Sequence, residues 1–154
     1  MSCLYIRIGA IGVKRDKIDD IFSKLVRGRV NYTCEYSGQY YPPGVQRRGC
    51  HCSHLWGRRH TATRWHPDNA FCHSYASHQY LGENPVAFRD WSLSQLGAEK
   101  YNLVKELANS AAFKFTKSDK EDLYQDLRRQ HKEMEEQRMD GVITRIEFTN
   151  LWFQ

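Results

Sequence analysis

The chain has 154 residues, of which 40% are hydrophobic and 27% are charged, and its net charge is +5. This length suggests one domain, and the apolar content is enough for a core, which excludes wholesale disorder; the positive charge fits a polyanionic partner. No apolar run approaches the roughly 20 residues of a membrane span. Arg7, within the mildly apolar N-terminal segment, argues against a signal peptide. The five cysteines cannot all form disulfide pairs, which favours a reducing cytoplasm.

The N-terminal part predicts one helix. Residues up to Val13 alternate weakly and indicate a short strand or an ordered tail. An amphipathic helix is expected over residues 14–29 because its apolar residues recur at helical spacing. That stripe consists of Ile18, Ile21, Phe22, Leu25 and Val26.

The middle, residues 31–81, has no long periodic pattern and is rich in Gly, Pro, Cys, His and Arg. Such a stretch is usually organised by a metal or by a partner. Residues 63–65 alternate like a strand, and the segment from Asn69 to about Tyr80 is compatible with a helix.

The last part predicts three helices and a strand. Asn84-Pro85 is a start signal for a helix over 86–96 that stops at Gly97, and a second helix follows over 98–112. A capping box beginning at Ser118 opens a charged helix that ends near Met139. From Val142 the tail alternates like a strand.

The spacing of His54, Asn69 and His78, within a predicted strand–loop–strand–helix order, resembles the HNH family of ββα-metal nucleases. The resemblance implies that His54 is the general base, that Asn69 holds the loop carrying it, and that His78 binds a divalent ion, Mg²⁺ or Mn²⁺. A neutral imidazole can accept a proton near pH 7, and a cation neutralises charge on the scissile phosphate. Asn69 and Ser53 are further candidate ligands, although Ser53 stands where many members have Asp or His.

Five short motifs, in this order and spacing, look like the NinG (Rap) family of phage recombination nucleases. They are residues 20–27, Cys34-Glu35-Tyr36-Ser37-Gly38, Cys52-Ser53-His54, Leu81-Gly82-Glu83-Asn84-Pro85 and the closing residues 141–148. Matches at 63–65 and 68–70 lie between them. The resemblance covers most of the chain from about residue 14. It implies that the substrate is branched DNA, such as junctions or flaps. It also implies that the protein is encoded by a phage or prophage and acts in the cytoplasm of a bacterial host cell.

Relatives in that family carry two cysteine pairs that bind a structural zinc. The matched positions here are Cys34, Ser37, Ser74 and Ser77, and serine is a poor zinc ligand. Two readings stay open. The fold holds without zinc, which we favour, or zinc is recruited by residues among Cys34, Cys50, Cys52, Cys72 and His73, of which only Cys34 falls on the matched spacing.

A basic cluster accompanies these motifs, and Asp68 is the only acid between Tyr36 and Tyr80. Arginine forks match phosphate oxygens, so the cluster is expected to contact DNA. Its members are Arg47, Arg48, Arg58, Arg59 and Arg64.

The expected fold is α+β, with a central ββα-metal core, an N-terminal helix and C-terminal helices. Residues 1–112 form the nuclease domain in this interpretation, and residues 113–154 add a charged helix and a tail to the same compact unit. The expected function is a metal-dependent, structure-selective DNA endonuclease, with a homodimer as a further possibility. The alternatives are a non-catalytic DNA-binding protein that keeps the fold and a zinc-organised interaction module.

Overall fold

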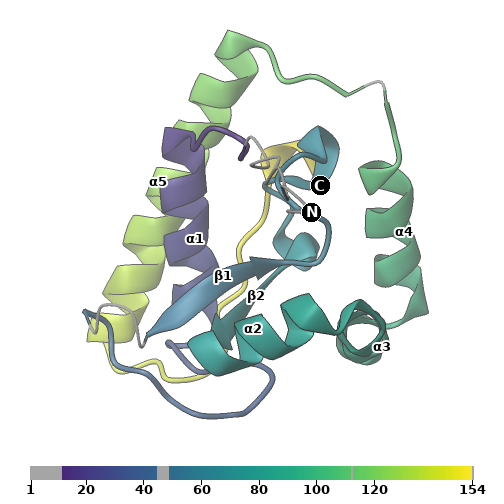
Figure 1. Ribbon diagram of the computed structural model, residues 1–154. Coiled ribbons are helices and arrows are strands. Elements are labelled where there is room, and N and C mark those ends of the chain that lie inside the picture. The colour runs from purple at the N-terminus through teal and green to yellow at the C-terminus, as the bar shows by residue number, and fades with distance from the viewer. Residues whose placement is uncertain (1–11, 45–48, 112, 154) are drawn as a thin grey trace, which may run out of the picture.

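The computed structural model describes residues 12–44, 49–111 and 113–153. Within these ranges the chain is an α+β protein with five α-helices and one two-stranded antiparallel sheet (Figure 1). The elements are α1 (Lys17–Arg29), β1 (Cys50–His54), β2 (Ala70–Ser74), α2 (Tyr75–Glu83), α3 (Pro85–Leu96), α4 (Ala98–Ala108) and α5 (Lys117–Met139). Short 3-10 turns lie at Thr61–Thr63, Pro67–Asn69 and Leu151–Phe153. No described helix is both long enough and apolar enough to cross a membrane.

Helix α1 carries the predicted apolar stripe but begins three residues later than expected. Asp16 is its N-cap and accepts a hydrogen bond from the Ile18 amide, while the Asp19 side chain accepts from the Asp16 amide. This capping box satisfies amides that have no partner inside the helix, so the helix starts after Asp16. The buried stripe packs in the main core with Trp65, Leu123, Leu127 and Phe148.

The sheet pairs β1 with β2, in a register that runs from Cys50 opposite Ser74 to His54 opposite Ala70. The strand predicted at residues 63–65 is wrong. Thr63 is the last residue of a 3-10 turn, residues 64–65 continue as a turn, and the second strand begins at Ala70. The reason is tertiary: the Trp65 indole donates to Asp19, and the Trp65 carbonyl accepts from Asn150. The segment after Asn69 is likewise a strand followed by a helix, not a helix throughout.

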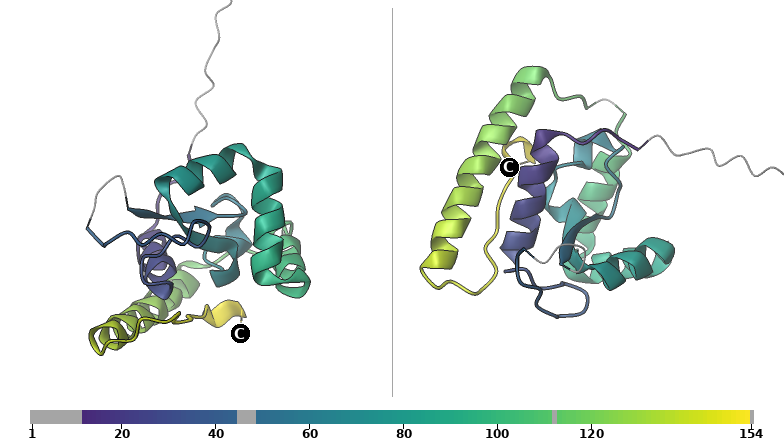
Figure 2. Two further views of the ribbon diagram at one scale, coloured as in Figure 1. Left: turned by 90° about the horizontal axis from the view of Figure 1, so that it is seen from below. Right: turned by 60° about the vertical axis from the view of Figure 1, so that its left-hand side comes forward.

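Helix α5 lies beside α1 and runs in the same direction (Figures 1 and 2). Lys17 pairs with Glu121 near the two helix starts, and Gly28 meets Met134 near the ends. A Cβ at Gly28 would lie 2.8 Å from Met134 Sδ, so glycine permits this close approach. The capping box of α5 uses Thr116 with Asp119, and the one predicted at Ser118 is therefore wrong.

The tail after α5 forms no strand within the described residues, contrary to the prediction for the segment from Val142. Its backbone groups find other partners. The Arg138 guanidinium donates to the carbonyls of Val142 and Thr144, and the Ile146 amide donates to the Arg29 carbonyl. The tail thus lies along α1 and α5 and places Phe148 in the core.

Helices α3 and α4 cover the remaining side (Figures 1 and 2). Helix α3 starts at Pro85 and stops before Gly97, as predicted, and α4 ends at Ala108 rather than at residue 112. A second apolar cluster, with Phe71, Leu81 and Phe88, joins α3 to β2 and α2.

Candidate active site

A cleft of about 620 Å³ lies beside β1, between α1 and α2. Residues of α1 form one wall, β1 forms the floor, and His78 of α2 lies opposite. Its lining includes Arg15, Asp19, Ser23, Arg27, Cys50, His51, Cys52, His54, Arg58 and His78. Two of the three residues that the sequence singles out, His54 and His78, thus face one cavity.

His54 is the last residue of β1, and its orientation is set by a backbone carbonyl. Its Nε2 lies 3.0 Å from the Arg64 oxygen, and its ring stacks on Phe22 at 5.9 Å between centroids. A carbonyl only accepts, so Nε2 carries the proton and Nδ1 keeps a lone pair. Burial lowers the pKa of His54 below its ordinary value of 6.5 although the hydrogen bond to Arg64 opposes this. The ring is therefore neutral at pH 7.

Asn69 ties together the loop that follows His54. Its Oδ1 accepts from the Trp56 amide at 2.8 Å, and its Nδ2 donates to the carbonyls of Trp56 at 2.8 Å and Thr63 at 2.9 Å. The side chain is 0% exposed and does not line the cleft. Asn69 thus has the position of a loop-holding residue. Its predicted second role as a metal ligand does not fit this geometry, because the amide is enclosed and already bonded.

His78 and Ser53 meet across the β1–α2 contact. The Nδ1 atom of His78 lies 3.1 Å from the Ser53 hydroxyl oxygen, and Ser53 is buried. His51 projects from the same face of β1 as Ser53, since strand residues two apart share a face. The His51 and His78 rings stack with centroids 5.8 Å apart and planes 8° apart. Burial, and then the neighbouring His51, lower the pKa of His78 below 6.5.

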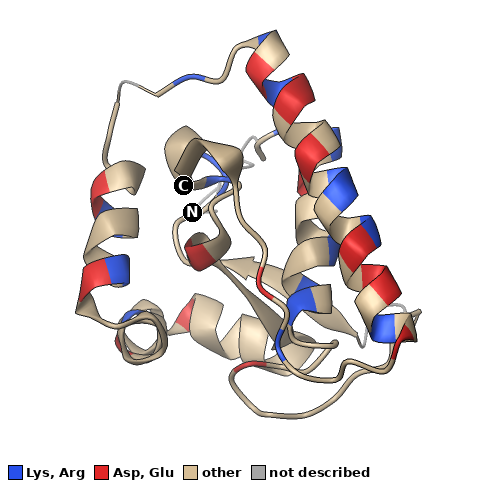
Figure 3. Ribbon diagram, turned by 180° about the vertical axis from the view of Figure 1, so that it is seen from behind, with Lys and Arg blue, Asp and Glu red and all other residues tan. Residues whose placement is uncertain are grey.

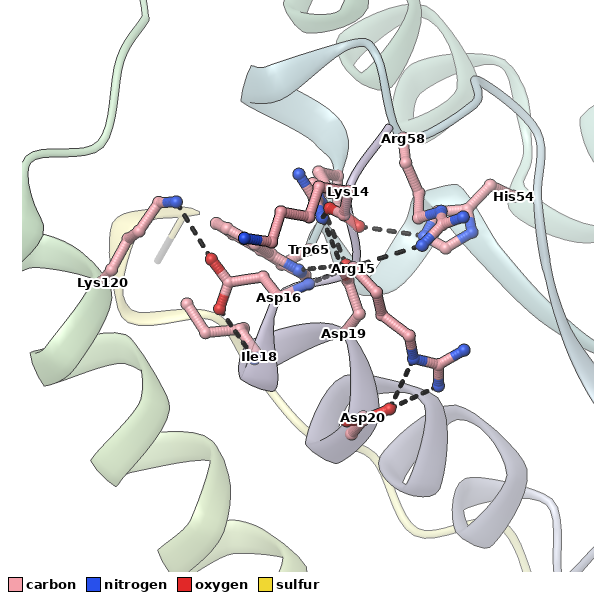
Figure 4. A network of polar contacts seen from close by, with 11 residues as sticks. Lys14, Arg15, Asp16, Ile18, Asp19, Asp20, His54, Arg58, Trp65 and Lys120 are labelled. Carbon is pink, nitrogen blue, oxygen red and sulfur yellow. Dashed lines mark hydrogen bonds and ion pairs between the residues drawn. The ribbon is translucent and has the colours of Figure 1, made fainter. Parts of the chain in front are cut away.

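Asp19 is the main cleft residue that sequence reasoning missed. Its buried carboxylate accepts from Arg64 Nε at 2.9 Å and from the Trp65 indole at 2.9 Å. Figure 4 shows Asp19 beside Trp65, at the start of α1. Asp19 reads in the sequence as an ordinary acid in the first helical turn, so no local signal marks it. His51 also lines the cleft, and the sequence gives one sign of it: His51 alternates with Ser53 along one strand.

The predicted DNA-binding arginines divide into different environments. Arg64 is buried, and its Nε and Nη2 atoms donate to Asp19 and to the Lys14 carbonyl, which leaves only Nη1 for a phosphate and does not favour the predicted DNA contact. Arg58 lines the cleft with a 36% exposed side chain and lies 3.8 Å from Asp19. Arg59 is exposed and donates to His60. Arg47 and Arg48 lie outside the described residues.

The four positions matched to a structural zinc converge in space. Cys34 Sγ lies 3.4 Å from Ser77 Oγ and accepts from the Ser37 amide at 3.4 Å, and Ser74 Oγ donates to Ser77 Oγ at 3.0 Å. Burial opposes ionisation of the thiol, but hydrogen bonds from Ser37 and Ser77 outweigh it and lower the pKa of Cys34 to about 7. Hydrogen bonds therefore join the 34–38 turn to the start of α2.

The other residues considered for zinc project from opposite faces of the sheet. Cys50, Cys52 and Cys72 contribute to the main core on the α1 side. His73 faces the other way, among the rings of Phe71 and Trp91, and neither of its ring nitrogens has a hydrogen-bond partner. Within residues 12–44, 49–111 and 113–153, no three His, Cys, Asp or Glu side chains are arranged to hold a metal ion.

Comparison of the chain with protein-family models, with curated proteins and with solved structures finds no match.

Proposed function

We propose that the chain is a divalent-metal-dependent DNA endonuclease of the ββα-metal type, with β1, β2 and α2 as its core. The observation that carries the proposal is the orientation of His54. Its Nε2 is fixed by the Arg64 carbonyl at 3.0 Å, the following loop is clamped by Asn69, and His78 stands across the same cleft. A general base needs this combination of a neutral ring, a fixed tautomer and access to the substrate.

His54 would act through Nδ1. In the proposed step this atom takes a proton from water while the water oxygen bonds to phosphorus and the bond to the leaving oxygen breaks. The lowered pKa leaves the base free of a proton at pH 7, which favours this role. Asn69 acts indirectly, since it holds the backbone of Trp56 and Thr63 on either side of the site.

A divalent ion bound here would neutralise charge on the scissile phosphate and on the leaving oxygen. The candidate donors are His78, which lines the cleft, and the Ser53 hydroxyl, which lies 3.1 Å from His78 Nδ1. Such a set fits an ion that has few protein ligands and keeps its other positions open to water and phosphate. An imidazole nitrogen suits Mn²⁺ better than Mg²⁺, which prefers oxygen. Of the two expected ions, the donor set thus favours Mn²⁺.

Cations at the cleft would position the DNA backbone. Arg58 is partly exposed, and Arg27 has no carboxylate within ion-pair distance among the described residues. Both can bind phosphate oxygens, and in this scheme Arg27 replaces Arg64, for which a DNA contact was expected from the sequence. The resemblance to NinG proteins implies branched DNA as substrate, and two coordinated active sites, hence a homodimer, would suit cleavage of a junction.

The second candidate is a non-catalytic DNA-binding protein of the same fold. Ser53 favours it, because a buried serine stands where many HNH proteins have a metal ligand. The absence of a three-ligand group in the described part of the chain points the same way. Its signature is salt-sensitive DNA binding without cleavage.

The deciding experiment is cleavage of a labelled four-way junction and of a matched linear duplex with Mn²⁺ or Mg²⁺. Wild type is compared with His54→Ala and His78→Ala. Gln79→Ala serves as the control, because Gln79 is an exposed neighbour of His78 on α2. We expect cutting, faster with Mn²⁺, that both histidine variants lose and the control keeps. Binding without cutting by wild type supports the non-catalytic protein, and the absence of both overturns both proposals.

A further inference from the structure

Helix α1 borders a second groove, of about 500 Å³, which it forms with α5. The cleft uses one face of α1, with Asp19, Ser23 and Arg27 at intervals of four residues and Arg15 just before the helix. The groove uses a different face of the same helix, because its α1 residues lie between those positions. Its lining consists of Lys17, Asp20, Ile21, Lys24, Tyr124, Arg128, His131, Lys132 and Glu135.

The groove has an excess of available positive charge. Lys24 and Arg128 have no carboxylate within ion-pair distance in the described part of the chain, and Lys132 lies 3.8 Å from Glu136. Asp20 is paired with Arg15 at 2.5 Å, which reduces the negative charge that it presents. Figure 3 shows how cationic and acidic positions alternate along α5.

Two adjacent arginines of α5, Arg128 and Arg129, lie in different surroundings. Arg129 does not line the groove and is held by Asp126 at 2.6 Å and Glu133 at 2.8 Å. Arg128, its neighbour in sequence, projects into the groove instead. Lys24 and Arg128 are therefore not neutralised by the acids of α5 in the way that Arg129 is, whereas Lys17 pairs with Glu121 at 2.6 Å.

Tyr124 holds two of these cations in place. Lys17 Nζ lies 4.1 Å from the centre of its ring, and Arg128 Cζ lies 5.6 Å from the same point. Contact of a cation with an aromatic face restricts the side chain without neutralising it. The groove thus presents positive groups that are partly ordered before any ligand binds.

We propose that the α1–α5 groove binds the phosphodiester backbone of DNA, as a second contact surface apart from the cleft. The inference rests on the proposed nuclease function and adds to it the path of the substrate. Lys17 and Lys24 lie on one side of α1, about 10 Å apart along its axis. This separation is close to the rise of roughly three base pairs, of 3.4 Å each, along the DNA helix axis. Lys24 precedes Arg27 by less than one turn, so α1 carries cations from the groove to the cleft.

The test uses DNA binding in the His54→Ala background, which removes the proposed base and separates binding from cleavage. The groove variant is Lys24→Ala, Arg128→Ala and Lys132→Ala, all at exposed positions. The control removes the same charge elsewhere, through Lys105→Ala, Lys114→Ala and Arg129→Ala, also at exposed positions. The logarithm of the affinity for a four-way junction and for a 30-base-pair duplex is measured against the logarithm of salt concentration.

We expect the groove variant to lower the salt slope by about 2 to 3, since each lost phosphate contact contributes about 0.9 to the slope. The control should leave the slope within about 0.5 of the parent protein. Equal slopes for the groove and control variants overturn this inference alone, whereas the absence of DNA binding by the parent overturns the proposed function with it. Vesicles containing phosphatidylserine complete the test: loss of vesicle binding in the groove variant with unchanged DNA binding would assign the groove to a membrane surface instead.

Discussion

Arg64 donates two hydrogen bonds to Asp19, from Nε to Oδ1 at 2.9 Å and from Nη2 to Oδ2 at 2.5 Å. The carbonyl of the same arginine holds Nε2 of His54 at 3.0 Å. The buried ion pair therefore anchors the residue whose backbone orients the proposed base. Stability of the fold and geometry of the cleft depend here on one contact between α1 and the loop after β1.

Replacing Asp19 with Asn should destabilise the protein by about 3 kcal/mol at pH 7, because it leaves the buried Arg64 charge without its partner. The measurement is unfolding in urea. Asp20→Asn is the matched control, since Asp20 is exposed and its pairing with Arg15 contributes little. Equal midpoints for the two variants would contradict a structural role for the buried pair.

The effect of Asp19→Asn should also depend on pH. Burial alone would raise the pKa of Asp19, but hydrogen bonds from Arg64, the Asp16 amide and the Trp65 indole lower it below 3.8. A carboxyl with a lowered pKa stabilises the fold fully above its ordinary pKa, and this contribution is lost as pH falls through the folded value. The difference between wild type and variant should therefore be constant above about pH 5 and shrink below pH 4.

Asn69→Ala should loosen the loop between Trp56 and Thr63. The change leaves one amide and two carbonyls without their present partner, at a cost of about 1–3 kcal/mol for each buried group that water cannot reach. Hydrogen exchange measured by mass spectrometry should rise first in this loop. Asn109→Ala is a suitable control, since its exposed amide bonds only within the end of α4. Unchanged exchange in the loop would show that other contacts hold it.

His73→Phe should stabilise the protein and flatten its response to acid. His73 is 0% exposed, both ring nitrogens lack partners, and burial lowers its pKa to about 3. Between pH 6.5 and about 3 the unfolded chain binds a proton at this position that the folded chain does not, so wild-type stability falls as pH falls. The slope is about 1.4 kcal/mol per pH unit in this window.

Thermal unfolding at pH 7 and pH 5 tests this directly. We expect the Phe variant to unfold at a higher temperature at both pH values, with the larger gain at pH 5. A smaller gain at pH 5 than at pH 7 would mean that His73 is charged in the folded protein.

The triple variant Ser37→Cys, Ser74→Cys and Ser77→Cys should create a zinc site with Cys34. Ligands of a tetrahedral thiolate site lie about 3.8 Å apart when each Zn–S bond is about 2.3 Å. The present separations of 3.4 Å from Cys34 Sγ to Ser77 Oγ and 3.0 Å from Ser74 Oγ to Ser77 Oγ are close to that spacing. Titration with Co²⁺ should give the absorption of a tetrahedral thiolate complex and raise the unfolding temperature. The same variant with Cys34→Ser should bind more weakly, and equal binding by both would place the ion elsewhere.

Local patterns predicted the helices well where the determining contacts are close in sequence. The apolar stripe of α1 and the Asn84-Pro85 start of α3 depend on neighbouring residues. The same kind of reasoning failed at residues 63–65 and in the tail after Val142. There Asn150 and Arg138 bind backbone carbonyls that a strand partner would otherwise bind, and Asp19 binds the Trp65 indole.

The sequence by itself determined the residue types of the candidate site: a histidine at the end of a strand, an asparagine that can bond a loop, and a histidine on the following helix. Only the tertiary structure decided which of their atoms are free. Hydrogen-bond capacity is consumed by partners far along the chain, so Arg64 is bound by Asp19 and Asn69 is enclosed by its loop. The position of His51 against His78, and of α5 against α1, likewise follows from packing between segments that the sequence places far apart.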